Sequence, residues 1–175
     1  ERTAEQILDQ LITNYTSAKR DLIIRLRKKQ LTENEFMTDV DRMLASIPAT
    51  ESTRQEARTM FWQYLFGYYR LTPLIDDPEV SDIHCIAYDQ IRIKKRGKRM
   101  SAGENISFAS KQEYSDFIER VATKNGVNVS NLNAIQRFTD DTSHPDYILR
   151  FTLVMPIVTT YESHYLIIRK VPRNF

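Results

Sequence analysis

Two arginines interrupt apolar segments near the C-terminal end of the chain. Arg150 lies in the segment 147–154 and Arg169 in the segment 165–171, and both segments are rich in β-branched and aromatic residues. Such segments are predicted to be strands, in which side chains alternate between two faces. A guanidinium group in such a strand either extends from the sheet edge into water or binds an anionic ligand. The pattern alone favours the first interpretation.

The histidines and the single cysteine argue against a metal centre or a nucleophilic pair. His84, His144 and His164 are scattered through the chain, whereas His84 and Cys85 are adjacent. Adjacent residues of a strand point to opposite faces, so these two side chains cannot share an ion or a proton. We therefore expect no metal site and no catalytic residue in this chain, and one cysteine excludes an internal disulfide.

Four carboxylates surround Pro78: Asp76, Asp77, Glu79 and Asp82. A cluster of this kind can bind a divalent ion or take part in acid–base catalysis. Aspartate beside proline is also the usual choice for turns and helix caps. We favour this structural role for the cluster.

The glycines exclude a phosphate-binding loop. The chain has only Gly67, Gly97, Gly103 and Gly126, and Gly97 alone precedes a lysine. The residue after that lysine is Arg99, where the G-x-x-x-x-G-K-[ST] motif requires serine or threonine. The Gly-rich dinucleotide fingerprint is also absent from the sequence. This chain alone is therefore not expected to be an enzyme that binds and cleaves a nucleotide.

The composition is that of an ordinary globular protein. The chain has 175 residues, of which 41% are hydrophobic and 27% charged, with a net charge of +2. This balance does not indicate nucleic acid as a partner. No apolar run approaches the roughly 20 residues of a membrane span, and no signal peptide is apparent. The sequence begins without methionine, and we expect it to be a segment of a longer protein cut at a domain boundary.

The first part of the chain, residues 1–70, is predicted to be a bundle of about three helices. Apolar residues recur at helical spacing over residues 3–30, 32–47 and 51–70. Capping-box pairs precede the first two helices, and Pro48 ends the second. Such a short bundle with short connections is expected to be antiparallel.

The second part, residues 71–175, is predicted to combine helices with a mostly antiparallel sheet. The fold class of the whole chain is therefore α+β: a helical bundle followed by an α/β sandwich domain. A basic hairpin turn, Lys94–Arg99, either grips phosphate or is the solvated tip of a sheet, and we favour the second. Strands are expected at residues 83–86, 90–95, 147–154 and 165–171, and a further strand is expected to begin at Arg99. A helix is expected to begin after Ser110, and loops are expected at residues 127–146 and 156–163.

The stretch Pro73–Ile83 ends in Val-Ser-Asp-Ile and resembles the opening of the N-terminal domain of secretion-system traffic ATPases. These are the bacterial ring-forming motors of type II secretion, type IV secretion, conjugation and pilus assembly. The segments Phe108–Ser110, Arg150–Pro156 and Ile167–Lys170 are similar to later motifs of the same domain. The resemblance covers about residues 71–172, and the helices of residues 1–70 resemble the extension that precedes this domain in the tight-adherence and conjugation branches.

The resemblance implies a function for the two arginines. In that family, arginines at the positions of Arg150 and Arg169 contact phosphates of ATP that a following P-loop domain binds with Mg²⁺. The chain would then be the regulatory, nucleotide-closing region of a hexameric ATPase in protein transport. Its expected partners are its own C-terminal domain, other subunits and inner-membrane platform proteins, and not nucleic acid. Its expected place is the cytoplasm, at the cytoplasmic face of the membrane.

Two other functions are compatible with the residues. The helical bundle and its aromatic segment, residues 61–69, fit a non-enzymatic adaptor that docks a partner of the secretion machinery. Alternatively, the hairpin cations and the Tyr and Phe rings fit binding of single-stranded nucleic acid, which would depend steeply on salt.

Overall fold

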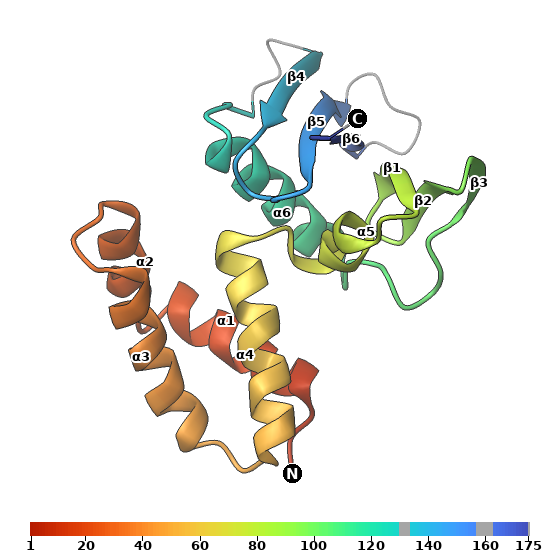
Figure 1. Cartoon of the computed structure of the whole chain (residues 1–175). Coiled ribbons are helices and arrows are strands. Elements are labelled where there is room, and N and C mark those ends of the chain that lie inside the picture. Colours follow the sequence, from red (N-terminus) through yellow and green to blue (C-terminus); the bar gives the residue numbers. More distant parts are fainter. Residues whose placement is uncertain (130–133, 157–162, 175) are drawn as a thin grey trace. The chain divides into compact units, whose positions relative to one another are not determined.

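The computed structural model describes residues 1–129, 134–156 and 163–174 of the chain. The polypeptide divides into two compact units, residues 1–69 and residues 70–175 (Figure 1). The first contains helices only, and the second contains the sheet. The predicted α+β fold class is therefore confirmed.

Unit 1 is a bundle of four helices (Figure 1). Thr3, Thr32 and Thr50 each accept a hydrogen bond from a backbone N–H three residues later, so each fixes a helix start. The complete capping box predicted at Thr3 is present. The helices are α1 (Ala4–Thr16), α2 (Arg20–Arg27), α3 (Glu33–Ala45) and α4 (Glu51–Phe66).

The prediction of one continuous helix over residues 3–30 is wrong, because the chain breaks between Thr16 and Arg20. The hydroxyls of Thr16 and Ser17 donate to the carbonyls of Ile12 and Thr13 at 2.6 Å each. Such bonds compete with the helical backbone ladder and favour a helix end. The bundle therefore has four helices where about three were expected. The helix predicted to extend to residue 70 also ends earlier, at Phe66.

Three aromatic rings form the centre of the bundle. Tyr15 of α1 lies 5.1 Å from Phe36 of α3 and 5.4 Å from Phe61 of α4, measured between ring centroids, and all three side chains are fully buried. Aromatic pairs at this separation add about 0.5–1.5 kcal/mol to the effect of burial alone. This cluster joins three of the helices and is the core of unit 1.

In its described residues, unit 2 is a six-stranded antiparallel sheet with two α-helices, α5 (Thr72–Asp76) and α6 (Lys111–Lys124). The strand order is β3-β2-β1-β6-β5-β4, so the first strand pairs with the last. Arg96 and Gly97 both have positive φ, 52° and 80°, and they form the predicted turn between β2 and β3. The strands are β1 (Val80–Ala87), β2 (Gln90–Lys95), β3 (Lys98–Ser101), β4 (Ile135–Asp140), β5 (Tyr147–Val154) and β6 (Tyr165–Pro172).

The prediction of a loop over residues 127–146 is wrong in its middle, where β4 pairs with β5 along its whole length. Phe138 of β4 stacks on Phe151 of β5 at 4.8 Å between centroids. The strand is short and its flanks are polar, so pairing with β5 rather than local pattern creates it. Most of the loop predicted at residues 156–163 lies outside the described residues.

One face of the sheet carries the core of unit 2. Ile83, Leu149, Phe151 and Ile168 are buried there, and α6 packs against this face. The hydroxyl of Tyr114 on α6 donates to the carbonyl of His164 at 2.6 Å. The alternate residues of β1, β2, β5 and β6 therefore lie on the opposite face, which we call the open face.

Candidate functional site

The open face brings both predicted site arginines together. Arg150 of β5 is the direct cross-strand partner of Arg169 of β6, and Thr139 of β4 and Asp82 of β1 continue the same row across the sheet. Directly opposed residues of antiparallel strands have Cβ atoms about 4.5–5.5 Å apart. Two guanidinium groups far apart in the sequence are thus adjacent on one surface.

A hollow of about 470 Å³ lies over this row. Arg137 of β4 also lines it, together with Arg150, Arg169 and the carboxylate of Asp82. Three positive charges and one negative charge give the hollow a net charge of +2. Phe138, Thr139, Phe151, Thr152 and Ile167 complete the lining.

The charges in this hollow are poorly balanced by the protein itself. Arg137 and Arg150 are exposed, and neither forms a hydrogen bond or an ion pair within the described residues. Arg169 has a single long ion pair, in which its Nε lies 3.8 Å from Oδ1 of Asp82. The side chain of Arg169 is 69% exposed, so this pair contributes little to stability. The three guanidinium groups therefore have donors free for a ligand.

A β-bulge places Asp82 in this row. The register between β1 and β2 shifts between Val80 and Asp82, which leaves Ser81 as the additional residue of β1. Val80 and Ile83 are both buried, while Ser81 and Asp82 are both partly exposed between them. Regular alternation would place Asp82 on the same face as Val80. The bulge therefore turns Asp82 to the open face. Bulges near functional sites commonly redirect a side chain in this way.

Two residues of the site were missed by the sequence interpretation. Arg137 falls in the segment that was predicted to be a loop. Apolar and polar residues do not alternate regularly there, because the less exposed positions are Gln136, Phe138 and Asp140, so periodicity does not mark a strand. Asp82 was grouped with the structural carboxylates, and nothing in the local sequence marks the bulge.

The other carboxylates near Pro78 have structural partners. Asp77 accepts a hydrogen bond from the backbone N–H of Glu79, and this bond holds the pKa of Asp77 below its ordinary value. Glu79 forms two hydrogen bonds of 2.7 Å with Arg96 of the basic hairpin turn. Asp76 lies 3.2 Å from Nε2 of His144. These contacts fix the entry to β1 and pair part of the hairpin charge.

The described residues contain no group of three or more His, Cys, Asp or Glu side chains that could hold a metal ion. His84 lies on the open face, and Cys85 is 1% exposed on the opposite face. Burial raises the pKa of the Cys85 thiol to about 12, so this group stays protonated near neutral pH. Its three guanidinium groups suit the hollow on the open face to binding anions.

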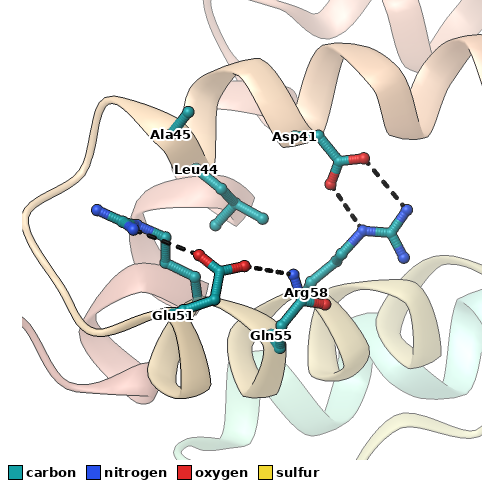
Figure 2. Close-up of a pocket in the computed structure, with 7 residues that line it drawn as sticks. Asp41, Leu44, Ala45, Glu51, Gln55 and Arg58 are labelled. Atoms are coloured by element: carbon teal, nitrogen blue, oxygen red, sulfur yellow. Dashed lines mark hydrogen bonds and ion pairs between the residues drawn. The ribbon is translucent and has the colours of Figure 1, made fainter.

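A second hollow, of about 540 Å³, lies between α3 and α4 of unit 1. Figure 2 shows that its charged side chains point toward one another. Arg58 donates to both carboxylate oxygens of Asp41, at 2.7 and 3.4 Å. Arg54 lies 3.5 Å from Glu51 and also donates to the carbonyl of Ile47. Its two arginines are thus matched by two carboxylates, and no net charge remains to attract an ionic ligand.

Comparison with known proteins finds a likeness among solved structures. No protein-family model and no curated protein matches this chain. Among solved structures, the chain is similar to the crystal structure of the VirB11 ATPase from the Brucella suis type IV secretion system, in complex with sulphate. The TM-score is 0.50 at 12% sequence identity.

The likeness covers 61% of this chain and 31% of that protein. At this identity it shows a fold of the secretion-ATPase kind, and this chain spans less than a third of the length of the relative. Separately, no helix within the described part of the chain combines the length and the apolar character that a membrane crossing requires.

Proposed function

We propose that this chain is the N-terminal region of a secretion ATPase and that its sheet closes on a nucleotide. The observation that carries the proposal is the adjacency of Arg150 and Arg169 on the open face, above a hollow of net charge +2. The secretion-ATPase-like fold supports it independently.

The donor set suits a polyphosphate. The planar guanidinium group presents a fork of N–H donors that matches a phosphate group with two parallel hydrogen bonds. Neighbouring strands lie about 4.8 Å apart. Arginines on adjacent strands can therefore bind adjacent phosphate groups of one polyphosphate. Arg137 extends the set to a third strand, β4, where its direct cross-strand partner is Thr152 of β5.

The proposed nucleotide is ATP, bound with Mg²⁺ by a P-loop domain that follows this region in the complete protein. ATP would supply the hydrolysable phosphate bond, and this region would supply charge stabilisation through Arg150 and Arg169. The full protein is proposed to be a hexamer that powers protein secretion, pilus assembly or conjugative transfer. Its partners would be inner-membrane platform proteins, and its location the cytoplasmic face of the membrane.

The test is ATP turnover of the complete protein carrying Arg150→Ala or Arg169→Ala. An arginine that stabilises the transferred phosphoryl group is worth about 10³–10⁵ in rate, and we expect at least a tenfold loss for each variant. Arg58→Ala is the matched control, because Arg58 is equally cationic but paired with Asp41 in unit 1. Turnover near the wild-type value in both sheet variants would remove the site assignment.

A second candidate function, an adaptor that docks a secretion-machinery protein, is favoured by two exposed apolar side chains of unit 1. Ile24 of α2 is 40% exposed and Trp62 of α4 is 38% exposed. The gene sequence beyond Phe175 distinguishes the candidates. A G-x-x-x-x-G-K-[ST] motif downstream favours the motor, and an open reading frame that ends without this motif favours the adaptor.

A further inference from the structure

We infer that Asp82 is a built-in competitor for the anion at Arg169. Without ligand its carboxylate is the ion-pair partner of Arg169, and a bound phosphate group must compete with it for the guanidinium group. The inference depends on the proposed function, because it assigns a regulatory role at the same hollow. It makes Asp82 a residue that lowers the affinity of the hollow for anions.

The two oxygens of Asp82 have different partners. Oδ2 accepts a hydrogen bond of 2.7 Å from the hydroxyl of Ser81, whereas Oδ1 faces Nε of Arg169 at 3.8 Å. The side chain of Asp82 is only 18% exposed, while that of Arg169 is 69% exposed. The carboxylate is therefore held in place, and the guanidinium group is the partner that can move toward a ligand.

The pair is suited to exchange rather than to permanent stabilisation. A separation of 3.8 Å is too long for a hydrogen bond, so a phosphate oxygen at the usual 2.7–2.9 Å would bind Arg169 more strongly. Ser81 is the additional residue of the bulge and also the donor to Asp82. The same local distortion thus turns Asp82 to the open face and fixes its orientation.

A second cation lies close enough to pair with Asp82 when Arg169 binds a ligand. Lys94 of β2 is the cross-strand partner of Asp82 on the side away from β6. Its ammonium group has no hydrogen bond or ion pair with any other described residue. Because Asp82 stands between Lys94 and Arg169, loss of one partner leaves the carboxylate beside the other. Displacement by an anion therefore does not leave a partly buried charge uncompensated.

The consequence is a higher cost of anion binding at the hollow. A carboxylate beside the hollow repels every anion, and a ligand must overcome both this repulsion and the pairing with Arg169. Asp82 therefore weakens anion binding at the three arginines, and removal of its charge is expected to strengthen it.

The experiment measures tripolyphosphate binding to the 175-residue chain by titration calorimetry at low salt, with wild type and Asp82→Asn. Asparagine is isosteric and can still accept from Ser81. Removing one negative charge within several ångströms of a multiply charged ligand is expected to tighten binding about threefold to tenfold. Asp89→Asn is the matched control: Asp89 is exposed at the β1–β2 turn, and its removal is expected to change affinity less than twofold.

A double-mutant cycle with Arg169→Ala tests whether Asp82 acts through Arg169. In that background only the repulsion remains, so Asp82→Asn is expected to tighten binding clearly less than it does in the wild type. Asp82→Thr, a residue suited to a strand, serves as a second variant if the asparagine form is unstable, and thermal unfolding checks both.

The outcomes separate the inference from the proposed function. If wild type binds and Arg169→Ala weakens binding, but neither Asp82 variant tightens it, the competition is overturned while the anion site stands. An equal effect of Asp82→Asn in both backgrounds also overturns it, since the carboxylate would then act without Arg169. If wild type shows no binding that Arg150→Ala or Arg169→Ala can weaken, the anion site itself fails and the inference fails with it.

Discussion

The hollow between α3 and α4 and the hollow on the open face differ in how their charges are balanced. The hollow between α3 and α4 is the larger, about 540 Å³ against about 470 Å³, but its arginines are paired with carboxylates. The hollow on the open face is smaller and holds three arginines beside one carboxylate. The difference shows that unbalanced charge, and not volume, identifies the candidate site. The hollow of unit 1 pairs its arginines with carboxylates, and the hollow of unit 2 leaves its arginines available.

The largest expected effect is on the stability of the bundle. Phe61 is fully buried and contacts Tyr15 and Phe36, so Phe61→Ala is expected to destabilise unit 1 by about 3–5 kcal/mol. Trp62 is the single tryptophan of the chain, and its fluorescence during urea unfolding reports on this unit. Thr59→Ala, at an exposed position of the same helix, is the control and is expected to change stability little.

Phe61→Ala and Thr59→Ala also allow the unfolding of unit 1 to be compared with that of unit 2. Cys85 is the single cysteine and is buried in the sheet, so its labelling by a thiol reagent reports on unfolding of unit 2. An unchanged Trp62 transition in Phe61→Ala would contradict the aromatic cluster as the core of the bundle.

A smaller effect is expected when one arginine is removed from each of the two hollows. Arg58→Ala breaks a partly exposed ion pair and is expected to lower stability by about 0.2–1 kcal/mol, with tripolyphosphate binding unchanged. Arg137→Ala removes a cation without a partner in the described structure, so it is expected to leave stability within about 0.5 kcal/mol. Its affinity for tripolyphosphate is expected to fall about threefold to tenfold. If both variants lose stability equally and neither loses affinity, the distinction between the two hollows disappears.

The smallest effect is the pH dependence of unit 1. Burial would raise the pKa of Asp39, but the hydrogen bonds from Lys19 (2.8 Å) and Tyr15 (2.5 Å) outweigh it and hold this pKa below its ordinary value. The resulting stabilisation is complete above the unfolded pKa of about 3.9 and is lost as the pH falls through the folded value. The stability difference between wild type and Asp39→Asn should therefore shrink below about pH 4. Urea midpoints from Trp62 fluorescence between pH 7 and pH 2.5 measure it, and a constant difference would exclude this linkage.

Elements set by local chemistry were predictable from the sequence. The threonine caps of α1 and α3 and the turn at Gly97 depend on residues within three or four positions, and the structure has them where expected. The strands that carry Arg150 and Arg169 were found because their apolar segments are long.

Features set by distant partners were not predictable. The strand β4 exists through its pairing with β5, so Arg137 was hidden in a predicted loop. Asp82 was missed because a one-residue register shift, created by pairing with β2, changes the face that it occupies. In both cases the deciding contact lies outside the window in which sequence periodicity is visible.

The strand order has a consequence for how the sheet is synthesised and folded. The strand β1 at the start of unit 2 pairs with β6 at its end, and this pair joins the hairpin strands β1–β3 to the strands β4–β6. Until β6 leaves the ribosome, β1 exposes an unpaired edge to other chains. Sheets with such distant pairings fold slowly, and their unpaired edges are prone to aggregation. The last strand therefore joins the two parts of the sheet. A nascent or truncated chain that ends before Tyr165 holds β1–β3 and the β4–β5 pair as separate pieces instead of one continuous sheet.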